Sequence, residues 1–166
     1  MSTESLIPPH GGNLVNCLVG ADKAAELIAA AAGLPKIILS SKQACDLEMI
    51  AIGAFSPLTG FVGKADFESI CKNTRLADGT VWPIPITLAV NDQTKAELSE
   101  GGQAALVHSD GTLLAVINVE EIYTHDKSLE IPNFLPSRVQ VADFDGYLKC
   151  STAGTPTRRR TGRGRR

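Results

Sequence analysis

Histidines, with the polar residues next to them, are the first places to look for chemistry in this chain. His108 is followed by a serine and an aspartate, which completes the three residue types of a nucleophilic triad. Adjacent residues at a hairpin cannot fold back onto one another as a triad requires, so we predict a simple turn. His10 is followed by two glycines, whose backbone N–H groups suit an anion. For His10 we favour instead a segment that lies across the surface.

Cationic and aromatic side chains offer a second kind of site, one that would hold a nucleotide. Three cations between residues 64 and 75 alternate with carboxylates in the same stretch: Lys64, Lys72 and Arg75 with Asp66, Glu68 and Asp78. This alternation favours a solvated surface of mixed charge. Trp82 lies between strand-like residues, and we predict that it belongs to the core or to a domain interface rather than to a base-stacking platform.

Residue spacing gives no support for a metal or phosphate site. The four cysteines stand far apart, which predicts reduced, mostly buried thiols of an intracellular protein: Cys17, Cys45, Cys71 and Cys150. A metal site needs closely spaced ligands, and none is visible. Gly101 and Gly102 lack the neighbouring lysine of a phosphate-binding loop. We therefore assign no catalytic residue, no cofactor-binding residue, no metal ligand and no cofactor.

Composition predicts one soluble domain. A chain of 166 residues buries one core but not two. No apolar run reaches the length that spans a membrane, and the N-terminus lacks the basic and then apolar layout of a secretory signal. We therefore expect a cytoplasmic protein without a membrane partner.

Charge is distributed unevenly along the chain. The formal net charge is −2, but residues 151–166 hold six of the 16 Lys and Arg residues and no acid. The other ten cations and all 18 acids leave residues 1–150 with −8. The pattern predicts an acidic domain that carries a basic, disordered tail.

Hydrophobic periodicity predicts an α+β domain, with helices first and strands later. Helices are expected from Asp22 to about Ala32, after a cap at Ser41, and over 64–72, with a helical turn at 94–98. Strands are expected over 36–39, 84–90, 104–108 and 112–119. The last two flank Ser109-Asp110-Gly111, which is a strong hairpin signal.

The stretch from Gly53 to Phe61, which we call the elbow, has turn chemistry between two phenylalanines. Gly53 stands where the end of a helix favours a left-handed residue. Pro57 fixes one φ angle, and Gly60 permits a positive one. Phe55 and Phe61 can both bury their rings. These features predict a rigid, anchored turn.

The elbow reads Gly-x-Phe-Ser-Pro-Leu-x-Gly-Phe, which closely resembles the signature of the N-terminal domain of ATP sulfurylase (sulfate adenylyltransferase). Further strings resemble that family in the same order, over about residues 5–130: Ile7 to Asn16, Thr74 to Gly79, Trp82 to Leu88 and Leu113 to Val119. Several strings in register are more specific than any one motif. The resemblance implies a PUA-like β-barrel with helices packed around it.

The resemblance also implies an activity that this chain does not carry alone. The family joins sulfate to the α-phosphate of ATP, which releases pyrophosphate and forms adenosine 5′-phosphosulfate. Its hallmarks lie in a separate nucleotide-binding domain, as a Gln-x-Arg-Asn string and a His-x-x-His string, and neither occurs here. We expect a fragment, inactive alone, whose partners are the catalytic domain and other subunits of a homo-oligomer. Whether the parent enzyme works in assimilation or in the reverse direction stays open.

Residues after about 130 depart from the family pattern. We expect a PUA-like domain over 1–130, an irregular segment over 131–150 and a disordered tail over 151–166. From Ser151 every residue is Ser, Thr, Ala, Gly, Pro or Arg, types encoded by GC-rich codons. One hypothesis is an out-of-frame product, which reading the DNA past the Glu130 codon in the other two frames would test.

Two other functions stay open at this point. PUA-like domains elsewhere bind RNA, and the run from Arg158 to Arg166 resembles an arginine-glycine nucleic-acid tail. The charge of −8 on the rest of the chain opposes binding of RNA by the domain itself. The other alternative is a scaffold that survives as a dimerisation or docking piece.

Overall fold

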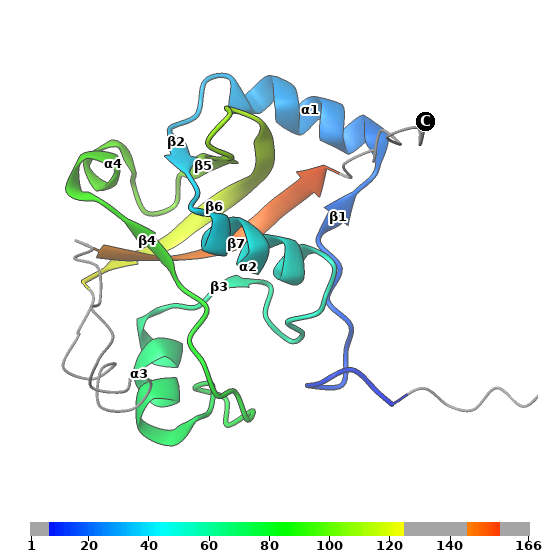
Figure 1. Ribbon diagram of the computed structural model, residues 1–166, viewed down its shortest axis with the longest axis vertical. Helices are drawn as coiled ribbons and strands as arrows, with labels where there is room; N and C mark the ends of the chain where they lie inside the picture. Colours follow the sequence, from blue (N-terminus) through cyan, green and yellow to red (C-terminus); the bar gives the residue numbers. More distant parts are fainter. Residues whose placement is uncertain (1–6, 125–145, 157–166) are drawn as a thin grey trace, which may run out of the picture.

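The computed structural model describes residues 7–124 and 146–156, which form one mixed sheet with helices packed on it (Figure 1). Within these residues the elements follow in the order β1 Leu18–Val19, α1 Ala21–Ala31, β2 Lys36–Ile38, α2 Ser41–Ala51, β3 Gly60–Phe61, α3 Lys64–Asn73, β4 Leu88–Val90, α4 Asp92–Glu97, β5 Gln103–Val107, β6 Leu113–Tyr123 and β7 Gly146–Pro156.

The predicted helices and longer strands are present, with small shifts at their ends. Residue 64 begins α3 as expected, and the β5–β6 hairpin turns where it was predicted. The predicted caps are wrong by one or two residues. Gly20 precedes α1, which places Asp22 in the first turn, and Ser40 rather than Ser41 caps α2. The prolines near residue 84 delay β4 until Leu88, because proline cannot donate to a strand ladder.

The sheet has the order β1-β7-β6-β5-β2 and is open among the described residues. Its path ends at β1 and β2, and these two strands do not pair with each other. The expected closed barrel is therefore wrong. Closure needs strands long enough to tilt and stagger around an axis, whereas β1 has two residues and β2 has three.

Strand β7 holds the sheet together. One edge pairs antiparallel with β6, and the other edge pairs in turn with β4, β3 and β1. The registers place Leu88 opposite Leu148, Phe61 opposite Cys150 and Leu18 opposite Thr155. Three segments that are far apart in the sequence are thus aligned along one strand.

The position of β7 corrects the expected irregular segment and tail. We predicted irregular structure over 131–150 and disorder from 151, but Gly146–Pro156 is a paired strand. From Ser151 on its residues are small or polar, as in a tail, and pairing along both edges overrides that local preference. At Gly154 a Cβ atom would lie 2.6 Å from Val19 Cγ1 and 2.7 Å from Leu27 Cδ1, so glycine lets β7 pass close beneath α1. Residues 125–145 and 157–166 lie outside the described residues.

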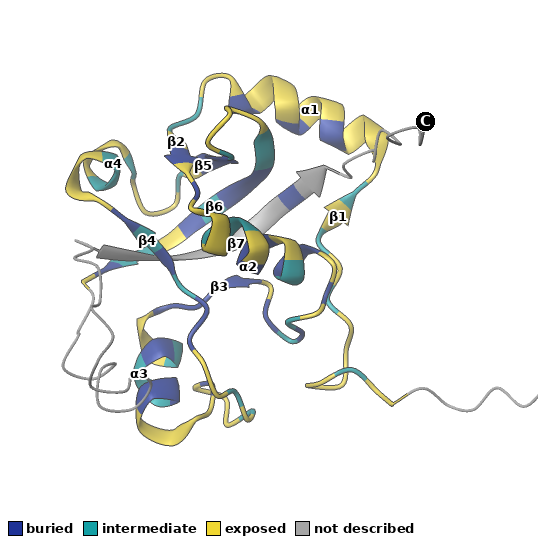
Figure 2. Ribbon diagram, in the orientation of Figure 1, coloured by how far each residue is buried: buried dark blue, intermediate teal, exposed yellow. Residues whose placement is uncertain are grey.

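Two apolar clusters lie on the two faces of the sheet. Figure 2 shows buried residues on the strands and on one side of the helices. Successive strand residues point to opposite faces. Ala104, Leu106 and Ile117 belong to the larger cluster, to which α2 and α3 contribute. Ala105 and Val116 belong to the smaller one beneath α1. The fully buried side chains nearly all lie in the larger cluster: Phe67, Leu47, Ile50, Ile70, Leu88, Leu106, Ile117 and Val119, with Val116 in the smaller one.

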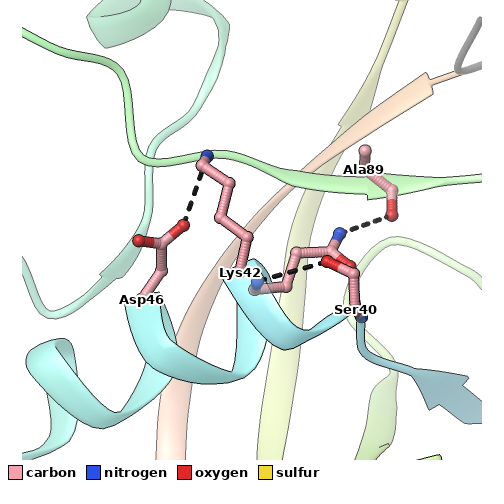
Figure 3. A network of polar contacts seen from close by, with 5 residues as sticks. Ser40, Lys42, Asp46 and Ala89 are labelled. Atoms are coloured by element: carbon pink, nitrogen blue, oxygen red, sulfur yellow. Dashed lines mark hydrogen bonds and ion pairs between the residues drawn. The ribbon is translucent and has the colours of Figure 1, made fainter. Parts of the chain in front are cut away.

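A capping box fixes the start of α2 and ties it to β4 (Figure 3). The Ser40 hydroxyl accepts from the Gln43 N–H at 3.2 Å, and the Gln43 Oε1 accepts from the Ser40 N–H at 2.9 Å. The Gln43 amide also donates to the Ala89 carbonyl at 3.0 Å. Lys42 Nζ lies 3.4 Å from a carboxylate oxygen of the nearly buried Asp46, which stands one helical turn further along α2. The cap therefore orients the helix that leads into the elbow.

Ser40→Ala should lower the free energy of unfolding by about 1 kcal/mol, because it leaves the Gln43 N–H without its acceptor. Urea denaturation of the whole chain measures the change. Ser41→Ala is the matched control, since it removes a hydroxyl from the next residue without removing the cap. Equal losses from the two substitutions would show that the cap does not stabilise α2.

Two Asp-Gly-Thr strings form the same kind of turn in different parts of the fold. Asp78 accepts from the Thr80 N–H and Asp110 from the Thr112 N–H, each at 2.8 Å. The glycine between them has a φ of +91° in the first turn and +84° in the second. The Thr80 N–H, followed by its hydroxyl, lowers the pKa of Asp78. The Thr112 hydroxyl, followed by its N–H, lowers the pKa of Asp110, with His108 adding to the effect.

The two lowered pKa values predict an acid-dependent loss of stability. A carboxyl whose pKa is lower in the folded chain stabilises the fold above its ordinary value of 3.8, and that stability is lost as pH falls through the folded pKa. In Asp78→Asn/Asp110→Asn, unfolding free energy should fall less steeply below about pH 4 than in the unaltered chain. Urea denaturation at a series of pH values measures this, and an equally steep acid limb would contradict the assignment.

Candidate functional site

The elbow is anchored in the core from one side. Leu58 and Phe61 are buried, as is the Ser56 side chain. Phe55 is half-buried, and its ring meets the Trp82 ring edge-on with centroids 6.0 Å apart. The prediction that both phenylalanines bury is confirmed for Phe61 and holds in part for Phe55. The anchored turn is thus present as expected.

The opening segment, residues 7–17, lies against the elbow. The Val15 N–H donates to the Ser56 hydroxyl at 3.0 Å, and that hydroxyl donates to the Gly53 carbonyl at 2.7 Å. The Cys17 N–H donates to the Ala51 carbonyl at 3.0 Å. Gly53 has a φ of +81°, and a Cβ atom there would lie 2.1 Å from the Val15 carbonyl oxygen. Only glycine lets the two backbones approach so closely.

His10 ties the opening segment to the strand-like stretch that carries Trp82. Its Nε2 lies 2.7 Å from the Val81 carbonyl oxygen, so this nitrogen donates. The centroids of the His10 and Trp82 rings lie 6.1 Å apart. At the next residue, a Cβ atom on Gly11 would lie 2.8 Å from Pro57 Cβ. His10 therefore holds a segment across the surface, and its Nε2 proton is engaged by a carbonyl rather than directed at an anion.

Trp82 has one polar atom without a partner in the described part of the chain. Its ring is half-buried between His10 and Phe55, which agrees with the predicted place in the core or at an interface. Its indole N–H is buried and makes no hydrogen bond there. An indole N–H usually finds an acceptor when it is buried.

Two hollows lie on either side of the Ser56–Pro57 bond. The first, of about 490 Å³, is lined by Ile7, Pro8, Pro9, His10, Leu14, Gly53, Ala54 and Ser56. The second, of about 350 Å³, is lined by residues 57–62, Asp66, residues 76–78 and Glu120. The first hollow is lined by no Lys, Arg, Asp or Glu side chain, whereas the second has three carboxylates.

The second hollow is unsuited to a nucleotide or sulfate. Carboxylates around it repel phosphate and sulfate oxygens. Two of them are also committed to local turns, because Asp66 accepts from the Ala77 N–H and Asp78 from the Thr80 N–H, each at 2.8 Å. The first hollow, which is apolar and nearly uncharged, suits the side chains of another protein segment.

The other sequence candidates are not brought together into a site. Both His108 contacts use the same nitrogen, since Ser109 Oγ and an Asp110 oxygen lie 3.4 and 3.5 Å from Nδ1. A triad needs the two groups on opposite ring nitrogens. Lys72 pairs with Glu68 at 3.3 Å, and Arg75 donates to the Gly79 carbonyl at 2.9 Å, so two cations of the suggested patch are engaged locally.

Cysteines and possible metal ligands are the remaining candidates in residues 7–124 and 146–156. No group of three or more His, Cys, Asp or Glu side chains there could hold a metal ion. The prediction of mostly buried thiols holds for Cys71 alone among these three, because Cys17 is half-buried and Cys45 is exposed. In the same ranges no helix is long and apolar enough to cross a membrane.

Sequence reasoning missed three groups that hold the opening segment in place. It did not single out the hydroxyl of Ser56, the carbonyl of Val15 or the carbonyl of Val81, which join the opening segment to the elbow and to the Trp82 stretch. Backbone carbonyls leave no trace in a sequence. The only available signal was the placement of glycines at residues 11 and 53, where the two segments approach each other.

The family and its relatives can now be compared with this geometry. The family model described as PUA-like domain matches residues 7–137. The chain is 44% identical over 124 residues to a sulfate adenylyltransferase of Synechococcus sp. strain JA-3-3Ab, which covers 75% of this chain and 32% of that protein. It is also 44% identical over 126 residues to a sulfate adenylyltransferase of Eremothecium gossypii, and this match covers 75% of this chain and 25% of that protein.

A solved structure is similar over nearly the whole chain. It is described as a hexameric APS kinase from Thiobacillus denitrificans, with a TM-score of 0.71 and 30% sequence identity. The similarity covers 95% of this chain and 29% of that one. This chain thus spans about a quarter to a third of the length of the relatives that it matches.

Gly53→Ala should lower the free energy of unfolding by at least about 2 kcal/mol, because alanine disfavours the left-handed φ and its Cβ would clash with the Val15 carbonyl oxygen. Gly12→Ala is the control, because Gly12 has a φ of +88° with nothing within 4 Å of its Cβ position, and should cost only about 1 kcal/mol. Urea denaturation compares the two. Equal losses would mean that the close approach at Gly53 does not constrain the fold.

Proposed function

The chain belongs to the PUA-like domain family, and we propose that it is the non-catalytic PUA-like part of a sulfate adenylyltransferase. Such an enzyme joins ATP and sulfate into adenosine 5′-phosphosulfate and pyrophosphate. The observation that carries the proposal is the 44% identity over 124 residues, confined to about a third of the relative. The elbow and opening-segment strings, which are packed on each other, lie within the family match.

The proposed role is support of a catalytic part rather than catalysis. Transfer of an adenylyl group needs cations and hydrogen-bond donors around the polyphosphate. The Gln-x-Arg-Asn and His-x-x-His strings are absent from the sequence, and the second hollow is acidic. We therefore propose that the parent protein supplies those groups from another domain.

The domain limits that we propose differ from those suggested by the sequence. Pairing of β7 with β6, β4, β3 and β1 supports a folded unit that extends to residue 156 instead of ending at 130. We further propose a cytoplasmic homo-oligomer as the parent, since the similar solved structure is described as hexameric.

A stand-alone RNA-binding module is the second candidate. It is favoured by one observation, the six arginines between residues 158 and 166. A gel-shift with the full chain and with residues 1–156, over a range of salt, separates the two roles. Binding that survives removal of residues 157–166 would favour an RNA-reading domain over the enzyme part.

The test of the main proposal has two arms. The chain alone should release no pyrophosphate from ATP and sulfate above the blank, because it lacks the cationic groups that stabilise the transition state. In a chimera, this chain replaces the matched 124-residue stretch of the Synechococcus enzyme. The turnover rate of the chimera should stay within about tenfold of that enzyme, which corresponds to an activation free energy raised by at most about 1.4 kcal/mol.

The Synechococcus enzyme itself is the positive control for both arms. Clear turnover by this chain alone would contradict a non-catalytic role. A soluble, assembled chimera without activity would contradict the assignment of this chain as the equivalent part of the enzyme.

A further inference from the structure

The surface around the first hollow is the most exposed apolar part of the described chain. We infer that this surface, which we call the docking face, binds the remaining two-thirds of a sulfate adenylyltransferase chain. Its apolar side chains come from the opening segment, the end of α2 and the stretch around Trp82: Ile7, Leu14, Ile52, Val81 and Ile84. The inference rests on the proposed function and adds the surface that the partner covers.

Exposure is concentrated on this face. Eight large apolar residues are exposed in the described ranges, and five of them belong to these three segments. Ile7 is 92% exposed and Leu14 is 66% exposed, and both line the first hollow. A concentration of exposed apolar side chains on three linked segments of a small domain favours a site of protein interaction.

The docking face is built before a partner arrives. His10 is bonded to Val81, Val15 to Ser56 and Cys17 to Ala51, so the three segments are held to one another. The Gly53 backbone lies directly against the Val15 carbonyl. Because the segments are already ordered, association costs less conformational entropy than docking of free loops.

The chemistry of the face selects an apolar protein surface. The first hollow is lined without Lys, Arg, Asp or Glu, although residues 1–150 carry −8 overall. Phosphate-rich ligands need cations that the hollow does not offer. Apolar residues in a concave, weakly polar lining are typical of the buried centre of a protein interface.

The share of the relatives that this chain covers points to the occupant. This chain matches 32% of the Synechococcus enzyme, and 29% of the hexameric kinase chain. The rest of such a chain belongs to further domains, and interfaces between domains of one chain cover roughly 600–1,500 Å². An apolar face on an otherwise acidic domain is the surface that such an interface would cover.

The test uses the chimera with the Synechococcus enzyme. Ile7→Asp/Leu14→Asp should raise the rate of limited proteolysis between the two parts about tenfold or more, as charge at the interface favours the undocked state. The control is Ile28→Asp/Ile38→Asp, two residues of α1 and β2 that are 54% and 69% exposed and lie outside the face. The control should leave the cleavage rate within about twofold of the parent chimera.

The outcomes separate this inference from the proposed function. The unaltered chimera must first be active and assembled; if it is not, the proposed function fails and the inference with it. If that chimera works and both double variants are cleaved at the parent rate, the docking face is wrong while the proposed function stands. Thermal melting of the full chain alone checks that both variants fold.

A second copy of this chain is the competing occupant. Sedimentation of the full chain alone decides this. We expect the unaltered chain and both double variants to sediment as monomers. A dimer of the unaltered chain that Ile7→Asp/Leu14→Asp dissociates, but Ile28→Asp/Ile38→Asp does not, would overturn the inference in favour of self-association.

Discussion

The carbonyl oxygen of Val15 occupies the space where a side chain on Gly53 would begin. A Cβ atom at residue 53 would lie 2.1 Å from it, and the φ of +81° disfavours any other residue. This contact seats the opening segment on the elbow, and the Ser56 hydroxyl fastens it by accepting from the Val15 N–H while donating to the Gly53 carbonyl within the elbow. The position of His10 over Trp82, and the hollow lined by Ile7 and Leu14, both depend on it. Gly53 thus permits the close approach that places Ile7 and Leu14 in the docking face.

The sheet supplies the frame behind that face. Strand β7 pairs with β6 along one edge and holds β4, β3 and β1 along the other, so the end of the elbow at Phe61 is fixed directly to it. β1 continues the opening segment and pairs with the far end of the same strand. The elbow and the opening segment are therefore both anchored to one strand, while α1 packs on the face of the sheet that carries the smaller cluster.

Local patterns predicted the parts of this fold that are determined locally. The hairpin at Ser109-Asp110-Gly111 and helix α3 follow from turn chemistry and helical spacing, and Phe61 is buried as its place in the elbow suggested. The second half of strand β7 could not be predicted, because its small and polar residues from Ser151 on gain their structure from pairing with distant segments. The open sheet was missed for a similar reason, since pairing between distant short strands decides closure. At the candidate site the residue types around the elbow were visible in the sequence, but the Val15 and Val81 carbonyls that join the segments were not.

The central claim is that the docking face lies against the rest of a longer enzyme. Amide hydrogen exchange over residues 10–17 and 52–56 tests it most directly, in the full chain and in the active chimera. The account predicts that these amides exchange at least about tenfold more slowly in the chimera, while amides of β2 exchange equally in both, because only the docking face is covered. Equal exchange of residues 10–17 and 52–56 in the two proteins would contradict it.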